Sequence, residues 1–208
     1  HYSMATALTY CLALVCTFVV VYGNGQDYWT SHSFQKPIDA DSITFHDNEI
    51  MEFHFHVYWF QQNQRSANAA TALRKKLLNA VQEGQFVAIF DGITNDIVPK
   101  VNVSNIPSVN NGPRGPHPCG SFEVWVPKEH LSEVLSFLMI NRGELTILHH
   151  PLSKHEIEDH TARSMWLGSP YRLDLTVLTE NIGYPPLEYP ELCLGYSKYS
   201  IACEHGKK

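Results

Sequence analysis

The chain has 208 residues, of which 44% are hydrophobic and 17% are charged, a balance that excludes a largely disordered protein and suffices for one domain with a substantial core. Its formal net charge of −6 argues against a nucleic-acid partner, which would require a basic surface. Twelve histidines are a high number for this length, and histidine is the most common metal ligand in proteins.

The first 25 residues differ from the rest of the chain. From Ala5 to Tyr22 the sequence is almost wholly apolar and uncharged, and Gly23 and Gly25 supply small residues before Gln26. This pattern predicts a signal peptide over residues 1–25, and hence a secreted protein without stable membrane association after cleavage. The alternative is a membrane-anchored protein, because about 18 apolar residues are close to the length that spans a bilayer. Residues 26–48 are polar, and we expect an N-terminal arm there.

Residues 51–59 alternate strictly between two kinds of side chain. The side chains expected to pack on a core are Phe53, Phe55, Val57 and Trp59. Those expected to point the other way are Glu52, His54, His56 and Tyr58. This period of two predicts a half-buried strand. Two imidazoles and a phenol on one face of a strand indicate that something binds at that face.

Further elements follow along the chain. Apolar residues at helical spacing predict helices over residues 66–83 and 131–141, and Gly84 suits the C-cap of the first. Short apolar or alternating runs predict strands over residues 86–90, 121–126 and 144–148, with a further strand over 173–178. Residues 95–118 are rich in Asn, Pro and Gly and are predicted to form a long loop.

The order β-α-β-β-α-β predicts an α+β fold of the ferredoxin-like, split βαβ type over residues 49–180, followed by a C-terminal tail over residues 181–208. We expect a four-stranded antiparallel sheet with the strand order 4-1-3-2 and both helices on one face. In this placement the first and third strands run parallel, and the fourth runs antiparallel beside the first.

This topology brings histidines from three segments to one edge of the sheet. They are His54 and His56 on the first strand, His117 just before the third strand, and His149 and His150 at the end of the fourth. We therefore expect these imidazoles to lie close together.

Glu123 and Trp125, on the third strand, would share the open face with the histidines of the first strand. Several histidines and one carboxylate suit a divalent transition metal. A site with open positions suits non-haem Fe(II) and oxygen chemistry, whereas three protein ligands and one water suit zinc. Spacing alone leaves both metals open.

Seven motifs occur in one order along residues 49–178 and together resemble the DOPA 4,5-dioxygenase family. They are His54-Phe55-His56-Val57-Tyr58-Trp59, Gly115-Pro116-His117-Pro118, Ser121-Phe122-Glu123-Val124, Asn141-Arg142-Gly143, His150-Pro151, Asp159-His160-Thr161 and Trp166-Leu167-Gly168. The resemblance implies a ferredoxin-like fold and an extradiol dioxygenase that opens the catechol ring of L-DOPA with Fe(II) and O₂.

The resemblance also implies roles for single residues. The implied metal ligands are His56, His117 and His150, with Glu123 as a further candidate. An acid or base role is implied for His160 and His54. The expected substrate contacts are Tyr58, Trp125 and His149.

Two other functions are compatible with the sequence. Ala162-Arg163-Ser164 stands where the family pattern has a further Asp-His pair, which favours a secreted binding module that has lost catalysis. A zinc-dependent hydrolase or lyase on the same histidines is the third hypothesis, and it predicts activity without O₂. Because ferredoxin-like domains often pair through the open sheet face, we also expect a homodimer.

Five cysteines are present, and Cys11 and Cys16 fall in the predicted signal peptide. In an oxidising compartment Cys193 and Cys203 would pair across a short loop, or Cys119 would pair with one of them. Asn102-Val103-Ser104 is a glycosylation sequon, so we expect a glycan on Asn102 if the chain is secreted.

Overall fold

The computed structural model describes residues 49–200 and residue 203. The predicted signal peptide, its anchor alternative and the N-terminal arm lie outside the described residues. Within the described part, no helix is both long and apolar enough to cross a membrane.

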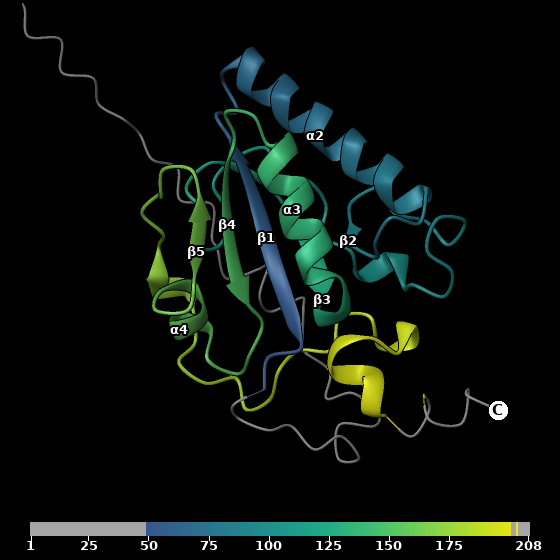
Figure 1. The fold of residues 1–208 in the computed structure, drawn as a ribbon. Coiled ribbons are helices and arrows are strands. Elements are labelled where there is room, and N and C mark those ends of the chain that lie inside the picture. Colours follow the sequence, from purple (N-terminus) through teal and green to yellow (C-terminus); the bar gives the residue numbers. More distant parts are fainter. Residues whose placement is uncertain (1–48, 201–202, 204–208) are drawn as a thin grey trace, which may run out of the picture.

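An antiparallel sheet forms the centre of the fold (Figure 1). Its strands are β1 (Glu52–Trp59), β2 (Ile89–Phe90), β3 (Gly120–Pro127), β4 (Thr146–Pro151) and β5 (Met165–Leu167). They are ordered β2-β3-β1-β4-β5, so the first strand lies in the middle. The predicted order of the first four strands and the α+β class are confirmed, whereas the predicted number of strands is one too few.

Two details of the predicted sheet are wrong. The first and third strands are antiparallel, with Phe53 opposite Val126 and Trp59 opposite Gly120. Helix α2 carries the chain back, so that β2 runs in the same direction as β1. The connection from β2 to β3 then reverses the chain, so that β3 runs opposite to both. The fifth strand is β5, not residues 173–178. There, Asp174 accepts hydrogen bonds from the backbone N–H and hydroxyl of Thr176 and caps a short 3₁₀ helix, Leu175–Val177.

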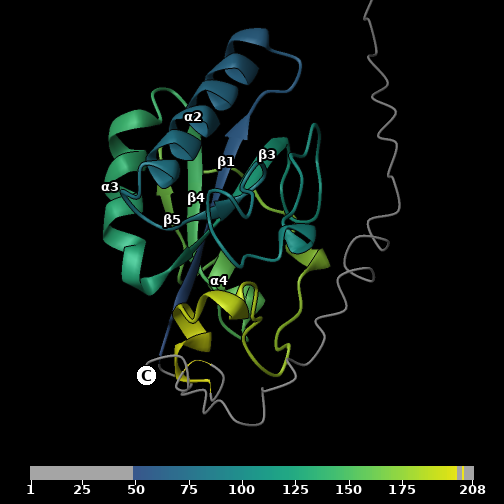
Figure 2. The ribbon, with the colours of Figure 1, turned by 90° about the vertical axis from the view of Figure 1, so that its right-hand side faces the viewer.

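Helices α2 (Gln64–Gln82) and α3 (Leu131–Asn141) cover one face of the sheet, as predicted (Figure 2). Helix α2 begins where the Asn63 side chain accepts a hydrogen bond from the N–H of Ser66, and Gly84 with φ of +73° follows its end. The inner side of α2 is apolar, with buried residues Ala70, Leu73, Leu77, Ala80 and Val81. A short helix, α4 (Glu156–His160), was not predicted, and it lies on the other side of the sheet.

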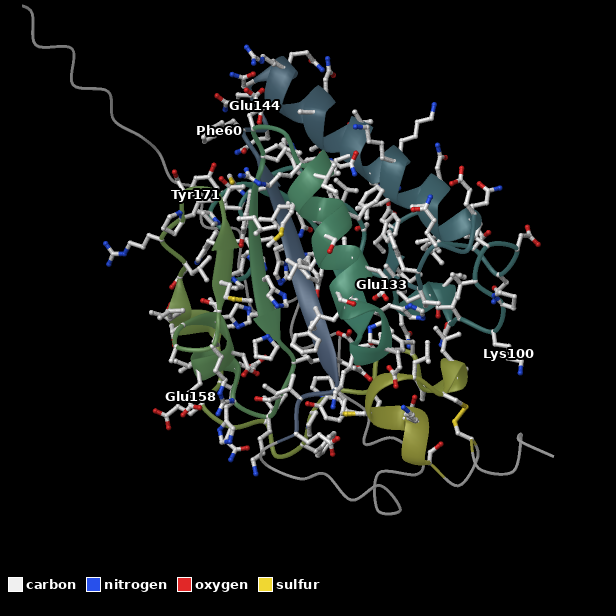
Figure 3. The ribbon with its side chains drawn as sticks, in the orientation of Figure 1. Phe60, Lys100, Glu133, Glu144, Glu158 and Tyr171 are labelled. Atoms are coloured by element: carbon white, nitrogen blue, oxygen red, sulfur yellow. A yellow bond between two sulfur atoms is a disulfide. The ribbon has the colours of Figure 1, made fainter. Side chains whose placement is uncertain are left out.

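The alternation of β1 is confirmed. Phe55 and Val57 are fully buried against α2 and α3, while His54, His56 and Tyr58 point to the opposite face. That face is not open, because the loop before β3, α4 and the C-terminal segment cover it (Figure 2). The open-face pairing on which the homodimer prediction depends is therefore absent from this surface. Unlike the histidines of β1, exposed charged side chains such as Lys100 and Glu158 point away from the fold (Figure 3).

The described part of the C-terminal tail packs against the sheet and its core. Tyr189 joins the main core, and the backbone N–H of Tyr196 donates to Oε1 of the buried Glu52 at 3.0 Å. Cys193 and Cys203 form a disulfide, and Cys119 is a buried free cysteine. Short 3₁₀ helices, Pro190–Leu192 and Gly195–Tyr199, shape this segment, which lies beside the first residues of β1 (Figure 1).

Gly120 supplies a test of the packing between β1 and β3. A Cβ on Gly120 would lie 2.6 Å from Cε2 of Trp59, which is buried in the core. We expect Gly120→Ala to lower the free energy of unfolding by about 2 kcal/mol, measured by urea unfolding. Gly112→Ala is the matched control, because a Cβ there meets nothing within 4 Å. Equal stability of the two variants would mean that the Trp59 ring moves aside without cost.

Candidate metal centre

A cavity of about 110 Å³ lies on the face of the sheet opposite α2 and α3. Five histidines line it: His54, His56, His117, His150 and His160. They come from β1, the loop before β3, the end of β4 and α4, so four separate segments meet here. The convergence expected from the topology is confirmed for His54, His56, His117 and His150, whereas His160 takes the place expected for His149.

His56 and His150 form the closest pair in the cavity. Their Nε2 atoms are 3.0 Å apart, and their rings are stacked with an interplanar angle of 8°. Nδ1 of His150 is 2.7 Å from the carbonyl oxygen of Pro151. A carbonyl only accepts, so Nδ1 of neutral His150 carries the proton and its Nε2 lone pair faces His56.

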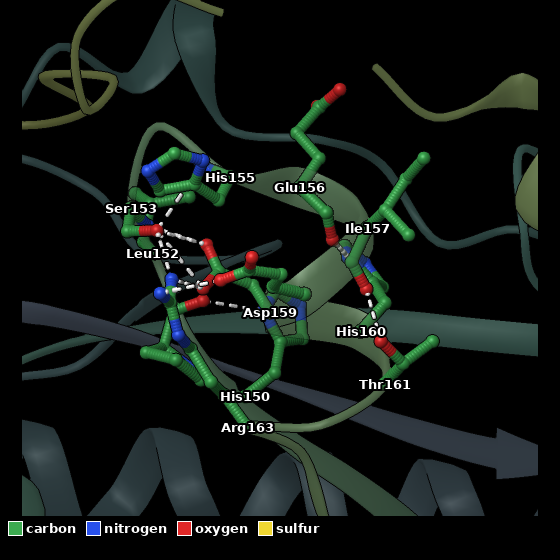
Figure 4. A network of polar contacts seen from close by, with 12 residues as sticks. His150, Leu152, Ser153, His155, Glu156, Ile157, Asp159, His160, Thr161 and Arg163 are labelled. Atoms are coloured by element: carbon green, nitrogen blue, oxygen red, sulfur yellow. Dashed lines mark hydrogen bonds and ion pairs between the residues drawn. The ribbon is translucent and has the colours of Figure 1, made fainter. Parts of the chain in front are cut away.

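His117 and His160 lie on either side of this pair. The His117 ring centroid is 4.1 Å from that of His56, and its Nδ1 is 2.7 Å from the hydroxyl of Tyr58. The His160 ring centroid is 4.0 Å from that of His150. Nδ1 of His160 donates to the carbonyl of Glu156 at 2.8 Å, which leaves its Nε2 lone pair unprotonated (Figure 4).

Asp159 holds α4, and with it His160, against the end of β4 (Figure 4). This carboxylate is buried and accepts from the backbone N–H of Ser153 at 2.8 Å and from the Ser153 hydroxyl. Arg163 donates to it at 3.0 Å. Arg163 belongs to the segment in which the sequence departs from the family pattern, and it thus has a structural role here.

Burial keeps four of the five histidines that line the cavity neutral. Burial, followed by the neighbouring His160 ring, lowers the pKa of His117 to about 3. Burial also lowers the pKa of His56, His150 and His160 below the ordinary value of 6.5. Neutral imidazole is the form that binds a metal. Two nitrogens that each lie about 2.1 Å from one ion at a right angle are about 3 Å apart, so the donor set fits a divalent transition metal.

His54 has a different environment. Its Nδ1 is 2.8 Å from Oε1 of Glu123, and its Nε2 is 2.9 Å from Oε2 of Glu188. Burial would lower the pKa of His54, but the two carboxylates raise it well above its ordinary value. Although the nitrogens of His54, His56 and His150 lie within 4.8 Å of one another, both nitrogens of His54 are already bonded to carboxylates. We therefore interpret His54 as a buried imidazolium rather than a ligand.

The sequence matches the model of the "Dopa 4,5-dioxygenase family" over residues 53–177. The chain belongs to this family.

The chain is also similar to individual proteins and to a solved structure. The chain is 42% identical over 175 residues to DOPA 4,5-dioxygenase of Amanita muscaria, covering 83% of this chain and 70% of that protein. It is 30% identical over 135 residues to an uncharacterized 21.2 kDa protein of Botryotinia fuckeliana, covering 61% and 62% of the two chains. A crystal structure of a candidate dioxygenase from Nostoc punctiforme is 27% identical, with a TM-score of 0.46 over 62% of this chain and 92% of that chain.

Not every residue that the sequence predicts for the site lines the cavity. His149 lies on the helix side of the sheet, stacked 4.4 Å from Phe55, so the expectation that it contacts substrate is wrong. Successive side chains of a strand alternate between its two faces, so His149 faces the helices because His150 faces the cavity. Tyr58 does not line the cavity either, and it instead holds Nδ1 of His117. Trp125 does line it, and its indole N–H donates to Glu123.

Glu123 and Glu188 both bind His54, one at each ring nitrogen. Burial would raise the pKa of Glu123, but His54 and Trp125 lower it to about 2, so this carboxylate is tied to His54 rather than to His56 or His150. Glu188 was missed, because it stands in the tail outside the residues matched by the dioxygenase family model. No local pattern in the tail distinguishes it, and only the packing of the tail over the start of β1 reveals it.

Asn102 lies on an exposed turn of the loop, where its side chain accepts from the N–H and hydroxyl of Ser104 at 3.2 and 2.6 Å. The turn is accessible, and glycosylation there stays a prediction.

The pKa of His117 predicts how acid affects the metal-free chain. Its folded-state pKa of about 3 lies below the ordinary 6.5, so the unfolded chain binds a proton in this range that the folded chain does not. The stability contributed by neutral His117 is therefore complete above pH 6.5 and is lost as the pH falls toward 3. We expect wild-type stability to fall by about 1 kcal/mol relative to His117→Gln between pH 7.5 and pH 5.5. Urea unfolding with a chelator measures it, and parallel pH profiles would contradict it.

Proposed function

We propose that this chain is an extradiol dioxygenase that opens the ring of L-DOPA, or of a related catechol, with O₂ and non-haem Fe(II). The observation that carries the proposal is the buried pair of His56 and His150, whose Nε2 atoms meet 3.0 Å apart in a cavity of a Dopa 4,5-dioxygenase family member. The 42% identity to a DOPA 4,5-dioxygenase supports the substrate class.

In this proposal His56, His150 and His117 would hold the metal. A set of neutral imidazole donors suits a divalent transition metal. Bound Fe(II) would supply the one-electron chemistry that allows O₂ to react with a catechol. Hydrogen bonds from Nδ1 of His150 to Pro151 and between His117 and Tyr58 fix the direction in which these rings point.

Histidines of the chain would accept and return the proton of the catechol hydroxyl. A catechol hydroxyl must lose its proton during the reaction, and a neutral imidazole beside the site can accept it. His160 fits this role, because its Nδ1–H is occupied by the Glu156 carbonyl and its Nε2 is unprotonated. His54, held as an imidazolium between Glu123 and Glu188, would be a candidate proton donor at that end of the cavity.

The walls of the cavity would exclude water and hold the ring. Leu152, Ile182 and Pro186 provide apolar surface, and Trp125 provides an aromatic face. An apolar wall with a few directed polar groups is the usual form of a small-molecule site.

The test is anaerobic loading of the chain with Fe(II), followed by L-DOPA and then air, with absorbance and an oxygen electrode as the two readouts. We expect oxygen uptake matched to a yellow product. Iron binding without uptake on L-DOPA or any simple catechol would overturn the proposed reaction. Binding of zinc alone with activity in the absence of O₂ would favour a hydrolase or lyase, and binding of no metal would favour a module without catalysis.

We further propose that the protein is secreted and that it forms a homodimer through a surface other than the covered face of the sheet. The signal-peptide pattern of residues 1–25 and the disulfide between Cys193 and Cys203 support secretion. Mass spectrometry of the exported chain would test this proposal through its N-terminus, and sedimentation would test the dimer.

A further inference from the structure

A tight hairpin places an arginine beside the proposed metal ligand His117. Arg114 and His117 exchange two backbone hydrogen bonds, at 3.0 and 3.1 Å, across the two-residue loop of Gly115 and Pro116. Gly115 has φ of +56°, as the first central residue of a type II′ turn requires. Residues paired in this way have Cα atoms about 5.5 Å apart and side chains on the same face. The guanidinium is therefore directed to the same side as the imidazole.

The Arg114 side chain lines the cavity, and the loop holds it there. Its Nη1 donates to Oδ1 of Asn110 at 3.1 Å. Asn110 is itself tied to Ser121 of β3 by two backbone hydrogen bonds, at 2.8 and 3.0 Å. The guanidinium is thus oriented by the sheet and not only by its own flexible stem.

Arg114 is the only arginine or lysine among the described residues that line the cavity. The carboxylates that line the cavity include Glu188 and Glu123, both bonded to His54. His54 and Tyr58 are separated by four residues of β1, or about 13 Å. Glu188 lies at the His54 end, whereas His117 and its hairpin lie at the Tyr58 end. The cavity therefore has an acidic end and a basic end, with His56 between them.

We propose that Arg114 binds the side-chain carboxylate of the substrate and selects catechols that carry an acid. This inference rests on the proposed function and adds the residue that decides which catechols are accepted. A guanidinium binds a carboxylate through two parallel hydrogen bonds, and the acidic end of the cavity repels the opposite orientation. The catechol oxygens then face His56 and His150 while the acid faces Arg114.

The experiment compares equilibrium binding and turnover for four catechols. L-DOPA and 3,4-dihydroxyphenylpropionate carry a carboxylate, whereas dopamine and 4-methylcatechol do not. We expect the Fe(II)-loaded wild-type chain, titrated without oxygen in a calorimeter, to bind both acids roughly 10- to 100-fold more tightly than dopamine. Arg114→Gln should remove this preference, mainly through KM, and Arg114→Lys should restore part of it. Arg65→Gln is the control, because Arg65 pairs with Glu144 on the exposed surface.

The outcomes separate this inference from the proposed reaction. The proposed role of Arg114 would be overturned if the wild-type chain bound catechols with and without a carboxylate equally. It would also be overturned if Arg114→Gln weakened the binding of L-DOPA and of dopamine equally. If Arg114→Gln fails to fold, the ligand series on the wild-type chain and Arg114→Lys still decides. A wild-type chain that prefers acids but consumes no oxygen would retain the role of Arg114 and reject ring cleavage.

Discussion

Replacing His150 with alanine is expected to abolish both Fe(II) binding and oxygen uptake, with a loss of activity of at least about 1,000-fold. His150 meets His56 at 3.0 Å, and its orientation is fixed by the carbonyl of Pro151. The adjacent His149 cannot replace it, because His149 faces the helices. Metal content after desalting and the rate at an oxygen electrode measure the two effects.

Controls distinguish a ligand from other histidines. His56→Ala and His117→Ala should behave like His150→Ala, whereas His160→Ala should retain iron and lose rate, because we assign it a proton and not the metal. His130→Ala changes a half-buried histidine outside the cavity and should retain both iron and rate. Full iron content in His150→Ala would reject the ligand assignment.

His54→Leu is expected to destabilise the fold by about 3 kcal/mol, because Glu123 and Glu188 lose the cation that they share. The side chains are 23% and 12% exposed, so water compensates for the lost partner only in part. The leucine fills most of the volume of the imidazole, and the effect is therefore one of charge. Chemical unfolding at pH 7.5, with a chelator present, measures it.

A second substitution tests the cause. If two unpaired carboxylates destabilise His54→Leu, then Glu188→Gln made in that background should recover part of the lost stability, although Glu188→Gln alone should destabilise the wild-type chain. An additive loss in the double variant would mean that the three side chains act independently.

The sequence was sufficient for the strand order and for much of the site, for a physical reason. The alternation of β1 separates Phe55 and Val57 from His54 and His56, and a strand buried on one face has only one register that satisfies this pattern. The same rule places His149 on the helix side, because it stands two residues after Ile147 of the main core. The face of each strand residue can therefore be predicted from the sequence.

The parts that could not be predicted depend on irregular backbone. The hairpin that brings Arg114 beside His117 is made by backbone hydrogen bonds, which have no periodic signal in a loop rich in Asn, Pro and Gly. Helix α4 is one turn long and is held by Asp159, so its position depends on tertiary contacts. Glu188 enters the cavity only because the tail folds back over β1.

The central position of β1 affects how the chain is made. On the ribosome, β1 is completed before β3 and β4, the two strands that flank it, and both lie more than 60 residues later. Its alternating apolar residues thus emerge without a partner, as a segment able to pair with other chains. Pairing over long sequence separation also makes folding slow. We expect the nascent chain to depend on chaperones until β4 is synthesised, and the cavity to be complete only after Glu188 has left the ribosome.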